Sequence, residues 1–274
     1  MLLNWSLDNW INDDKSLYRL CKTSQNLWII TIKNDFVSGH IESLGVWEGD
    51  VTNYFVKNVK SGDTVVEIGS NIGYYTTLLA KLVSSTGMVY AYEANKTVYD
   101  LASLSLKMND LWNRVKLKNV AVTDKKGSIN FLCYEKCAYM PVNIGASHIF
   151  TDNDFDDMES KIIQKVETVA LDDDLPHLKN VDWLKMDIEG SEILAIKGAK
   201  KLILSSPRLK IIMEWGPDML KKYGNIRKFI GDLRSYGFKF YKIRRDASTT
   251  EELSDEYLLN SHNVEDLLLV KPNA

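Results

Sequence analysis

The stretch from Thr64 to Gly73 constrains the fold of this chain more than any other part of the sequence. Its first five residues are too few and too β-branched for a helix, and helical apolar spacing begins at Tyr74. Glycines at positions 69 and 73 let the intervening backbone come close to a ligand. A buried strand that passes through an acidic residue into such a loop predicts a strand–loop–helix unit that seats a nucleotide-like cofactor.

This loop lacks the third glycine of a dinucleotide fingerprint. Its pattern is E-x-G-x-x-x-G, with Asn71 where G-x-G-x-x-G needs a glycine to admit a pyrophosphate. A second predicted strand, residues 88–92, ends in Glu93, where a carboxylate can accept both hydroxyls of a ribose. A ribose without a diphosphate indicates S-adenosylmethionine, and the alternative is a tight turn that binds nothing. The candidate cofactor-binding residues in this region are Glu67, Gly69, Ser70, Asn71, Gly73 and Glu93.

Length and composition indicate a globular enzyme of ordinary charge. A chain of 274 residues with a hydrophobic fraction of 45% can form one α/β domain and an appendage. Its 34 basic and 37 acidic residues nearly cancel, which argues against a strongly basic nucleic-acid surface. Residues 1–15 do not resemble a signal peptide, and no run approaches the roughly 18 apolar residues of a membrane span. We therefore expect a cytoplasmic protein.

Strands and helices keep alternating after the first unit, which is typical of a parallel sheet covered on both faces. The further predicted strands are residues 115–122, 181–188 and 208–215, and the helices are residues 96–108, 191–204 and 225–236. Residues 128–134 and 162–171 are predicted to be extended. The closing strands, residues 238–244 and 266–270, show no helix between them, so they pair antiparallel if adjacent. The expected fold is α/β, a doubly wound, Rossmann-like, seven-stranded and mostly parallel sheet with an antiparallel last strand, as in class I methyltransferases.

The first sixty residues carry the weakest pattern. Residues 27–32 are predicted to form a strand and residues 51–59 a short helix, and tryptophans are frequent in this part of the chain. Aromatic residues at this density most often pack against a core, although they also stack on sugar rings. We expect residues 1–60 to form a small N-terminal cap over the cofactor edge, and residues 61–274 to form the methyltransferase domain.

The run from Leu184 to Glu192, LKMDIEGSE, resembles the K-x-D-x-E-G-x-E signature of FkbM-type methyltransferases. Trp47-Glu48, residues 67–73, Glu93 and residues 119–124 and 143–147 fall in matching order, so the resemblance covers roughly residues 45–270. It implies methyl transfer from S-adenosylmethionine to a hydroxyl, often on a sugar or a polyketide. It also implies that Ala121 contacts the cofactor and that Glu48 contacts either ligand. This chain has Glu67 where the family commonly has Asp.

Transfer of a methyl group to an alcohol requires an in-line geometry and a base that takes the hydroxyl proton. Asp187 lies at the carboxyl end of its predicted strand, the edge where doubly wound sheets bind ligands, so it is the first candidate for the base and a further cofactor contact. An N-cap of the next helix is its alternative role. Glu189 is the second catalytic candidate, and orients the acceptor or shares a divalent cation with Asp187. Asp187, Glu189 and Glu214 offer oxygen donors that suit magnesium better than zinc.

The remaining candidates are four predicted acceptor contacts and one further catalytic candidate. Lys185 points to the same side as Asp187 if the strand alternates, and either steers the acceptor or forms a structural ion pair. Glu214 contacts the acceptor or has its charge satisfied by a backbone amide. In the long loop at residues 137–150, Asn143 and Ser147 suit a polyol, and His148 is a catalytic candidate because its pKa lies near neutrality, unless it is only solvated.

Three other functions stay open at this point. A nicotinamide-dependent oxidoreductase shares the sheet and Glu93, but should have the third glycine. A noncatalytic binding module on the same sheet would fail to bind the cofactor. A ribose O-methyltransferase acting on nucleic acid makes the same demands on a base, although the nearly balanced charge argues against it.

Overall fold

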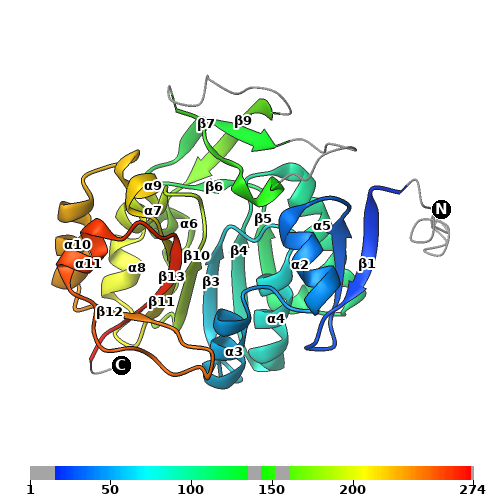
Figure 1. Ribbon diagram of the computed structural model, residues 1–274, viewed down its shortest axis with the longest axis horizontal. Coiled ribbons are helices and arrows are strands. Elements are labelled where there is room, and N and C mark those ends of the chain that lie inside the picture. Colours follow the sequence, from blue (N-terminus) through cyan, green and yellow to red (C-terminus); the bar gives the residue numbers. More distant parts are fainter. Residues whose placement is uncertain (1–15, 135–142, 152–160, 273–274) are drawn as a thin grey trace.

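Residues 16–134, 143–151 and 161–272 are described by the computed structural model. Its centre is a sheet of seven strands in the order β12-β13-β11-β10-β3-β4-β5 (Figure 1). The strands are Thr64–Ile68 (β3), Met88–Tyr92 (β4), Val115–Lys118 (β5), Trp183–Met186 (β10), Lys210–Trp215 (β11), Lys239–Lys242 (β12) and Glu265–Val270 (β13). Strand β13 runs antiparallel to both of its neighbours, and the other neighbouring pairs are parallel. The predicted doubly wound sheet with a reversed last strand is therefore confirmed.

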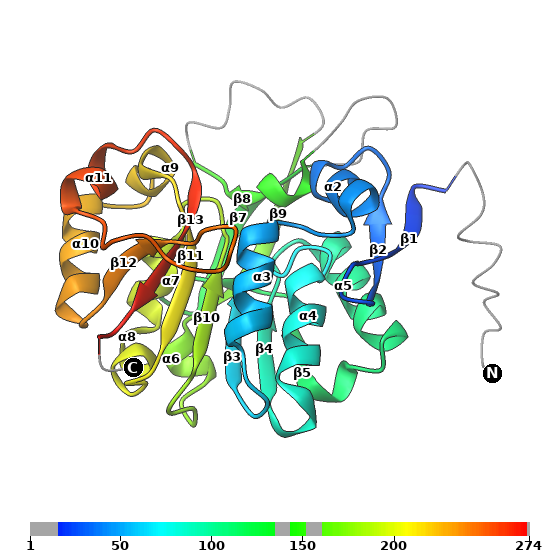
Figure 2. The ribbon, with the colours of Figure 1, turned by 60° about the horizontal axis from the view of Figure 1, so that its bottom comes forward.

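Helices cover both faces of this sheet, which is why its central strands are apolar on both sides. One face packs against α3 (Gly49–Asn58), α4 (Tyr74–Leu82) and α5 (Lys96–Met108), and Figure 2 shows α3 and α4 in front of β3 and β4. The helices associated with the other face are α6 (Leu171–Asp174), α7 (Glu192–Gly198), α8 (Lys200–Leu204), α9 (Pro217–Lys221), α10 (Ile226–Ser235) and α11 (Asp255–Asn260). Two separate clusters of buried apolar side chains result, one on each face.

The N-terminal segment joins the first of these two clusters. It contains the antiparallel pair β1 (Tyr18–Lys22) and β2 (Trp28–Ile32), followed by α2 (Phe36–Leu44). Strand β2 packs on α5, where the Ser105 hydroxyl accepts a hydrogen bond from the Ile30 amide at 3.1 Å. The strand expected at residues 27–32 and the helix expected at residues 51–59 are present, whereas β1 and α2 were not predicted.

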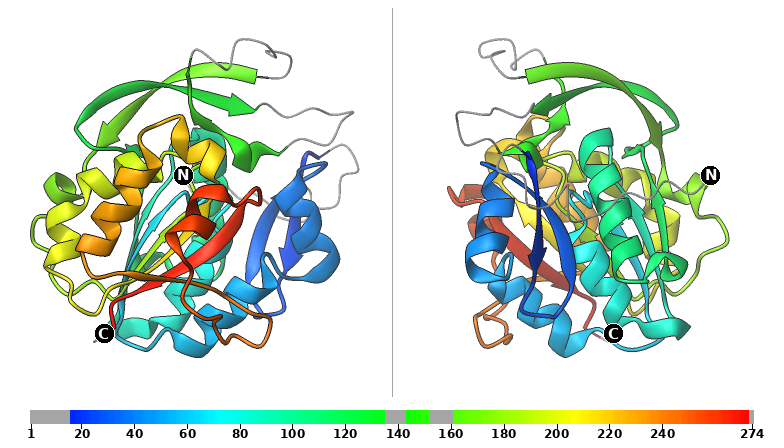
Figure 3. Two further views of the ribbon diagram at one scale, coloured as in Figure 1. Left: turned by 60° about the vertical axis from the view of Figure 1, so that its left-hand side comes forward. Right: turned by 90° about the vertical axis from the view of Figure 1, so that its right-hand side faces the viewer.

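A second sheet of four strands, in the order β6-β9-β7-β8, stands over the carboxyl end of the first (Figure 3). Its strands are Ala121–Val122 (β6), Gly127–Tyr134 (β7), His148–Ile149 (β8) and Lys161–Val169 (β9), and the 3₁₀ helix η3 (Ile144–Ala146) precedes β8. The single strand predicted over residues 115–122 is therefore wrong, because its end belongs to this other sheet. The reason is Asn119, whose amide donates to the carbonyls of Glu93 at 2.9 Å and Ala94 at 3.0 Å and so ends the ladder of β5.

Two further expectations need correction. The helix predicted over residues 191–204 breaks at Ala199 into α7 and α8, next to Gly198, whose Cβ would lie 2.1 Å from the carbonyl oxygen of Thr123. The connection between β12 and β13 was expected to lack a helix, but it contains α11, which is only six residues long. Such a short helix shows too few turns for its periodicity to be recognised. In the described ranges, no helix combines the length and the apolar character that crossing a membrane needs.

Candidate active site

A cavity of about 230 Å³ lies at the carboxyl ends of β3, β4, β10 and β11, under α2 and η3. Ten of the predicted site residues line it, namely Glu48, Gly69, Asn71, Glu93, Ala121, Asn143, Ser147, Asp187, Glu189 and Glu214. The cavity lining does not include the other five predicted residues, Glu67, Ser70, Gly73, His148 and Lys185. The structure thus brings together segments that are far apart in the sequence, at the edge where doubly wound sheets bind their ligands.

The loop after β3 requires both of its glycines. Gly69 has a φ of 87°, and a Cβ there would lie 2.0 Å from the carbonyl oxygen of Asp187. Gly73 also has a φ of 87°, and its Cβ would lie 2.8 Å from the Cα of Ala102, so it lets α4 begin directly against α5. The Ser70 hydroxyl donates to the carbonyl of Tyr92 at 3.3 Å rather than facing the cavity. Gly69 therefore shapes the cavity floor, whereas Gly73 and Ser70 hold the loop.

Glu93 holds this loop against the end of β4. Its Oε2 accepts from the amide of Asn71 at 2.7 Å, and its Oε1 accepts from the amide of Asn95 at 2.7 Å. Burial raises the pKa of Glu93 to about 7, although the two backbone donors act in the opposite direction. The carboxyl group lines the cavity and retains lone pairs for a ligand with hydroxyl groups.

Glu67 lies beneath the cavity floor. It is fully buried and stands beside Lys185 in the register of β3 and β10, and neither of its carboxyl oxygens has a hydrogen-bond partner among the residues that the structure describes. Burial raises the pKa of Glu67 to about 7. The structure thus places this expected cofactor contact one layer away from the cavity surface.

Lys185 and Asp187 form a partly buried ion pair at the end of β10. The Nζ of Lys185 donates to Oδ2 of Asp187 at 3.1 Å and lies 4.8 Å from the ring centroid of Tyr75. The Tyr75 hydroxyl in turn donates to Oε2 of Glu48 at 2.9 Å. Burial lowers the pKa of Lys185, but the nearby carboxylates outweigh it and the pKa is raised. Of the two predicted roles for Lys185, the geometry favours the ion pair, because its ammonium group faces Asp187 from behind the cavity wall.

Asp187, Glu189 and Glu214 form an acidic cluster, with one carboxylate oxygen of each within 4.8 Å of the others. Burial raises the pKa of Glu189 to about 8 and that of Glu214 to about 11, and in both cases Asp187 is the next largest cause. Glu189 adopts a left-handed φ of 56°, a conformation that is strained for a side chain other than glycine. Helix α7 begins at Glu192 with Ser191 as its N-cap, so Asp187 does not have the alternative capping role.

The cover of the cavity joins two distant segments. Asp35 caps α2 by accepting from the amide of Ser38 at 2.9 Å, and its other oxygen accepts from the amide of Ile144 in η3 at 3.0 Å. Ser147 lines the cavity and donates its hydroxyl to the carbonyl of Ile144 at 2.6 Å. His148 lies in β8 with its Nδ1 2.8 Å from the carbonyl oxygen of Ala146.

Asp35 and Tyr75 were missed at the level of sequence. An Asp directly before a periodic apolar run is a recognisable N-cap signal, so the start of α2 was visible in residues 35–41. Nothing in the sequence reveals that the same Asp also holds a segment 109 residues away, or that Tyr75 joins Glu48 to Lys185.

A sequence model of the methyltransferase FkbM domain matches residues 67–240 of this chain. The chain belongs to the FkbM methyltransferase family. Among curated relatives, it is 23% identical over 188 residues to "Methyltransferase sdnD" of Sordaria araneosa, and the match covers 61% of this chain and 72% of that protein. This match supports methyltransferase activity for the family and does not specify the methyl acceptor.

Solved methyltransferase structures resemble the FkbM methyltransferase only distantly. An O-methyltransferase from Bacillus cereus, determined with S-adenosylhomocysteine, is 15% identical, with 81% of this chain and 79% of that chain covered and a TM-score of 0.44. An rRNA methylase from Streptococcus thermophilus is 13% identical, with 81% and 93% covered and a TM-score of 0.43. At this distance the site of the FkbM methyltransferase has to be interpreted from its own residues.

Proposed function

We propose that this FkbM methyltransferase transfers a methyl group from S-adenosylmethionine to a hydroxyl oxygen of a sugar, a glycan or a polyketide-like acceptor. The observation that carries the proposal is the position of Asp187. Its carboxylate lines the same cavity as Gly69 and Glu93, at the next strand end along the sheet, and Lys185 holds it from behind. A cofactor cradle and a carboxylate base thus share one enclosed space.

The residues fit S-adenosylmethionine. Gly69 lines the cavity and brings the loop after β3 against the backbone of Asp187, where a Cβ would clash, and Glu93 offers a buried carboxyl group for ribose hydroxyls. The cavity lining contains five carboxyl groups and, in the described ranges, neither lysine, arginine nor histidine, so no cationic side chain of the lining opposes a cationic sulfonium. When bound, the cofactor supplies an activated methyl group whose C–S bond breaks as the new C–O bond forms.

The protein contributes proton removal and orientation. We assign Asp187 to accept the hydroxyl proton, because an alcohol is a weak nucleophile until a base takes its proton. The ion pair with Lys185 fixes Oδ2 of Asp187. Glu48, Glu189 and Glu214 also line the cavity, and we assign them to accept hydrogen bonds from the acceptor's hydroxyl groups.

We include one divalent cation, such as Mg²⁺, as a candidate second cofactor. The cluster of Asp187, Glu189 and Glu214 fits a hard cation, because its three oxygens lie within 4.8 Å of one another and Oε2 of Glu214 is buried with no hydrogen-bond partner in the described part of the chain. A cation there would lower the pKa of the acceptor hydroxyl. The three carboxylates of the cluster repel one another when all are charged. Without a cation, protonation of Glu189 and Glu214 relieves this repulsion.

Calorimetric titration with S-adenosylmethionine and S-adenosylhomocysteine tests the cofactor, with NAD as control and with and without chelation of divalent ions. We expect micromolar binding of the first two ligands and none of NAD. Binding of NAD would replace the proposal with a dehydrogenase, and the absence of cofactor binding would favour a noncatalytic module.

Turnover tests the base. A panel of glycan and polyketide hydroxyls is screened with radiolabelled cofactor, and Asp187→Asn is compared with the unchanged protein on any acceptor found. Asp187→Asn should bind the cofactor normally and lose at least 100-fold in kcat, within the range that general base catalysis contributes. Near-normal turnover by this variant at saturating acceptor would show that Asp187 is not the base. A ribose acceptor in nucleic acid is a less favoured alternative, because its phosphates would face the acidic cavity lining.

A further inference from the structure

Tyr75 lies behind the wall of the cavity and contacts two residues of the candidate active site. It is the second residue of α4, is buried, and does not itself line the cavity. Its hydroxyl donates to Oε2 of Glu48 at 2.9 Å, and its ring centroid lies 4.8 Å from Nζ of Lys185. One buried side chain thus meets a proposed acceptor contact with its hydroxyl and the partner of the proposed base with its ring.

The ring of Tyr75 restricts the ammonium group of Lys185. Lys185 is only 2% exposed, and a buried ammonium group is stabilised where carboxylates and aromatic faces replace water. Its Nζ donates to Oδ2 of Asp187 at 3.1 Å. The side chain of a lysine is long and flexible, so an aromatic face beside Nζ limits the directions in which the ammonium group can donate. The position of the Tyr75 ring therefore bears on the position of the Asp187 carboxylate.

The ring of Tyr75 is in turn fixed by other aromatic side chains. The ring of Phe55 in α3 meets it at a centroid distance of 5.6 Å and an interplanar angle of 67°, and the ring of Tyr74 meets it at 5.2 Å and 85°. Both contacts are edge to face, an arrangement that aromatic pairs favour. Phe55 and Tyr74 are buried in the core on the side of α3 to α5. Lys185 is therefore contacted by a well-packed part of the core.

Glu48 needs support for a different reason, because its backbone is strained. Its φ of 42° and ψ of 68° are left-handed, a conformation that persists in such a residue only where the surroundings hold it. Glu48 occupies the N-cap position of α3 without a side-chain capping bond, and its carboxyl group accepts from the Tyr75 hydroxyl instead. That bond uses Oε2, so Oε1 stays able to accept a hydrogen bond from the methyl acceptor.

We propose that Tyr75 is a positioning residue of this active site, with a separate role for each part of its side chain. Its ring holds Lys185 in place, and thereby Asp187, whereas its hydroxyl holds Glu48 in place for the acceptor. This inference rests on the proposed O-methyltransferase function and deepens it. Misplacement of the base lowers kcat, whereas loss of a contact made equally before and during the reaction raises KM, so the two roles should appear in different kinetic constants.

Two substitutions at position 75 separate these roles. Tyr75→Phe keeps the ring and removes the hydroxyl, so KM for the acceptor should rise about fivefold or more, while kcat should stay within about twofold. Tyr75→Leu removes both groups, so KM should rise similarly and kcat should also fall about tenfold or more. The assay uses the full protein, saturating S-adenosylmethionine and the best acceptor from the panel of glycan and polyketide hydroxyls. Calorimetry should show unchanged affinity of both variants for S-adenosylhomocysteine.

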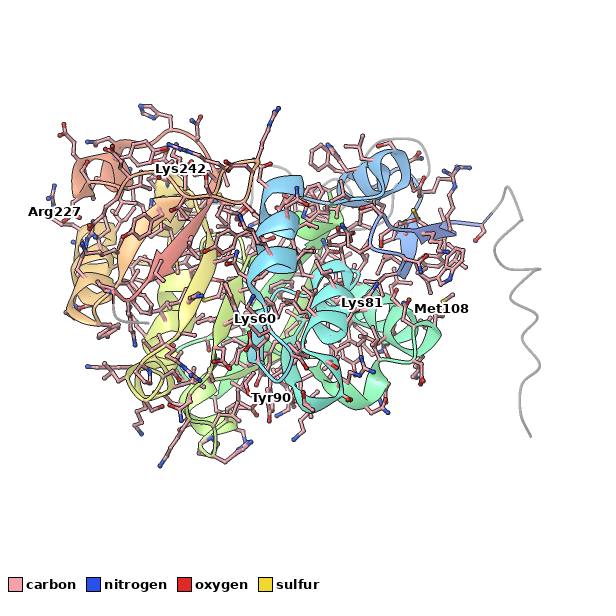
Figure 4. The ribbon with its side chains drawn as sticks, turned by 90° about the horizontal axis from the view of Figure 1, so that it is seen from below. Lys60, Lys81, Tyr90, Met108, Arg227 and Lys242 are labelled. Carbon is pink, nitrogen blue, oxygen red and sulfur yellow. The ribbon has the colours of Figure 1, made fainter. Side chains whose placement is uncertain are left out.

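Tyr90→Phe and Tyr90→Leu are the matched controls. Tyr90 is another buried tyrosine with a lysine beside its ring, since Nζ of Lys116 lies 5.3 Å from the ring centroid. It packs in the core on the other side of the sheet and does not line the cavity. Figure 4 shows Tyr90 in the lower part of the view, away from the blue helix α2 in the upper part. Tyr90→Leu should lose stability in urea much as Tyr75→Leu does, and both Tyr90 variants should keep kcat and KM.

An unchanged KM in Tyr75→Phe, or a kcat in that variant as low as in Tyr75→Leu, would overturn the inference. So would an equal loss of kcat in Tyr90→Leu, because the effect would then follow from stability alone. Weaker binding of S-adenosylhomocysteine that accounts for the lower turnover of Tyr75→Leu would also overturn it, and would assign Tyr75 to the support of the cofactor loop. An unchanged protein that binds the cofactor and methylates no hydroxyl of the panel would refute the proposed function, and the inference with it.

Discussion

Glu93 is held by the backbone around it. Its carboxyl group accepts from one amide in the cofactor loop, that of Asn71, and from one amide after β4, that of Asn95. Such hydrogen bonds hold the carboxyl group in place without a neighbouring cationic side chain. The carboxyl group therefore remains able to interact with a ligand. Glu67 is different, because it is buried and the structure describes no residue that hydrogen-bonds to either of its carboxyl oxygens.

Glu93→Ala should weaken the binding of S-adenosylmethionine at least tenfold. The substitution removes the carboxyl group from the cavity and leaves the amides of Asn71 and Asn95 without their acceptor, so the loop loses its fixed shape. Calorimetric titration measures the change, and Glu251→Ala, at an exposed glutamate, is the control. Unchanged affinity in Glu93→Ala would exclude Glu93 as a cofactor contact.

Glu67→Gln should stabilise the protein at high pH and not at low pH. The pKa of Glu67 is about 7 in the folded state, above its ordinary value of 4.5, so the folded protein holds this proton over a pH range where the unfolded chain has lost it. Stability therefore falls as the pH rises from about 4.5 to 7, by roughly 3 kcal/mol for this group. Glutamine has no such penalty.

Urea unfolding at pH 8 and pH 5 measures this effect. Glu67→Gln should be more stable than the unchanged protein at pH 8, and the difference should shrink towards zero at pH 5. Glu251→Gln should change little at either pH, because Glu251 is exposed. A stability difference that does not depend on pH would mean that Glu67 does not titrate in this range.

At the scale of elements, the side chain of Asp35 joins the two parts of the cover over the cavity. Asp35 joins α2 to η3, and both elements line the cavity through Phe36, Val37, Ile144 and Gly145. A Cβ at Gly145 would lie 2.8 Å from the side-chain amide of Asn71, so the cover also approaches the cofactor loop closely. Movement of either element would therefore change the shape of the cofactor site.

Asp35→Ala should weaken cofactor binding several-fold and lower the free energy of unfolding by about 1–2 kcal/mol, the usual cost of losing an N-cap. Asn225→Ala is a matched control, because Asn225 caps α10 by accepting from the amide of Lys228 at 2.9 Å, and Asn225 does not line the cavity. It should lose similar stability and keep full affinity for S-adenosylmethionine. Equal cofactor affinity in both variants would show that the Asp35 link does not shape the site.

The sequence predicted those elements whose signals are local. Thr64 to Gly73 combines a β-branched strand with an acidic residue and two glycines, and Glu93 follows at a recognisable distance. Asp187 was placed at a strand end by its motif. Strand β6 has only two residues and so shows no period, which is why it was joined to β5. The burial of Glu67 and Lys185 behind the cavity wall depends on the packing of α4 over β3 and β10, and no pattern in the sequence encodes it.

On the scale of the whole molecule, β13 binds the two faces of the central sheet into one unit. Leu268 belongs to the core on the side of α3 to α5, whereas Leu267 and Leu269 belong to the core on the other side, and all three are buried. The strand lies between β11 and β12 and hydrogen-bonds to both. Loss of packing in this strand should therefore affect both cores together.

Leu268→Ala and Leu269→Ala should each lower the free energy of unfolding by about 2–5 kcal/mol, the usual range for a buried leucine replaced by alanine. We expect both to shift a single cooperative transition in urea, followed in parallel by fluorescence and circular dichroism. Val264→Ala, at a side chain that is 54% exposed, should change the midpoint little. Two separate transitions, of which each variant moves only one, would show that the two cores unfold independently.

The place of β13 also bears on how the protein forms during translation. Strand β12 leaves the ribosome before β13, yet in the sheet it contacts β11 only through β13. Until residues 265–270 have emerged, β11 has an open edge and β12 has no partner in the central sheet. Open edges of this kind favour pairing with other chains. The central sheet is therefore completed only after β13 has been synthesised, because β11 keeps an open edge until that strand pairs with it.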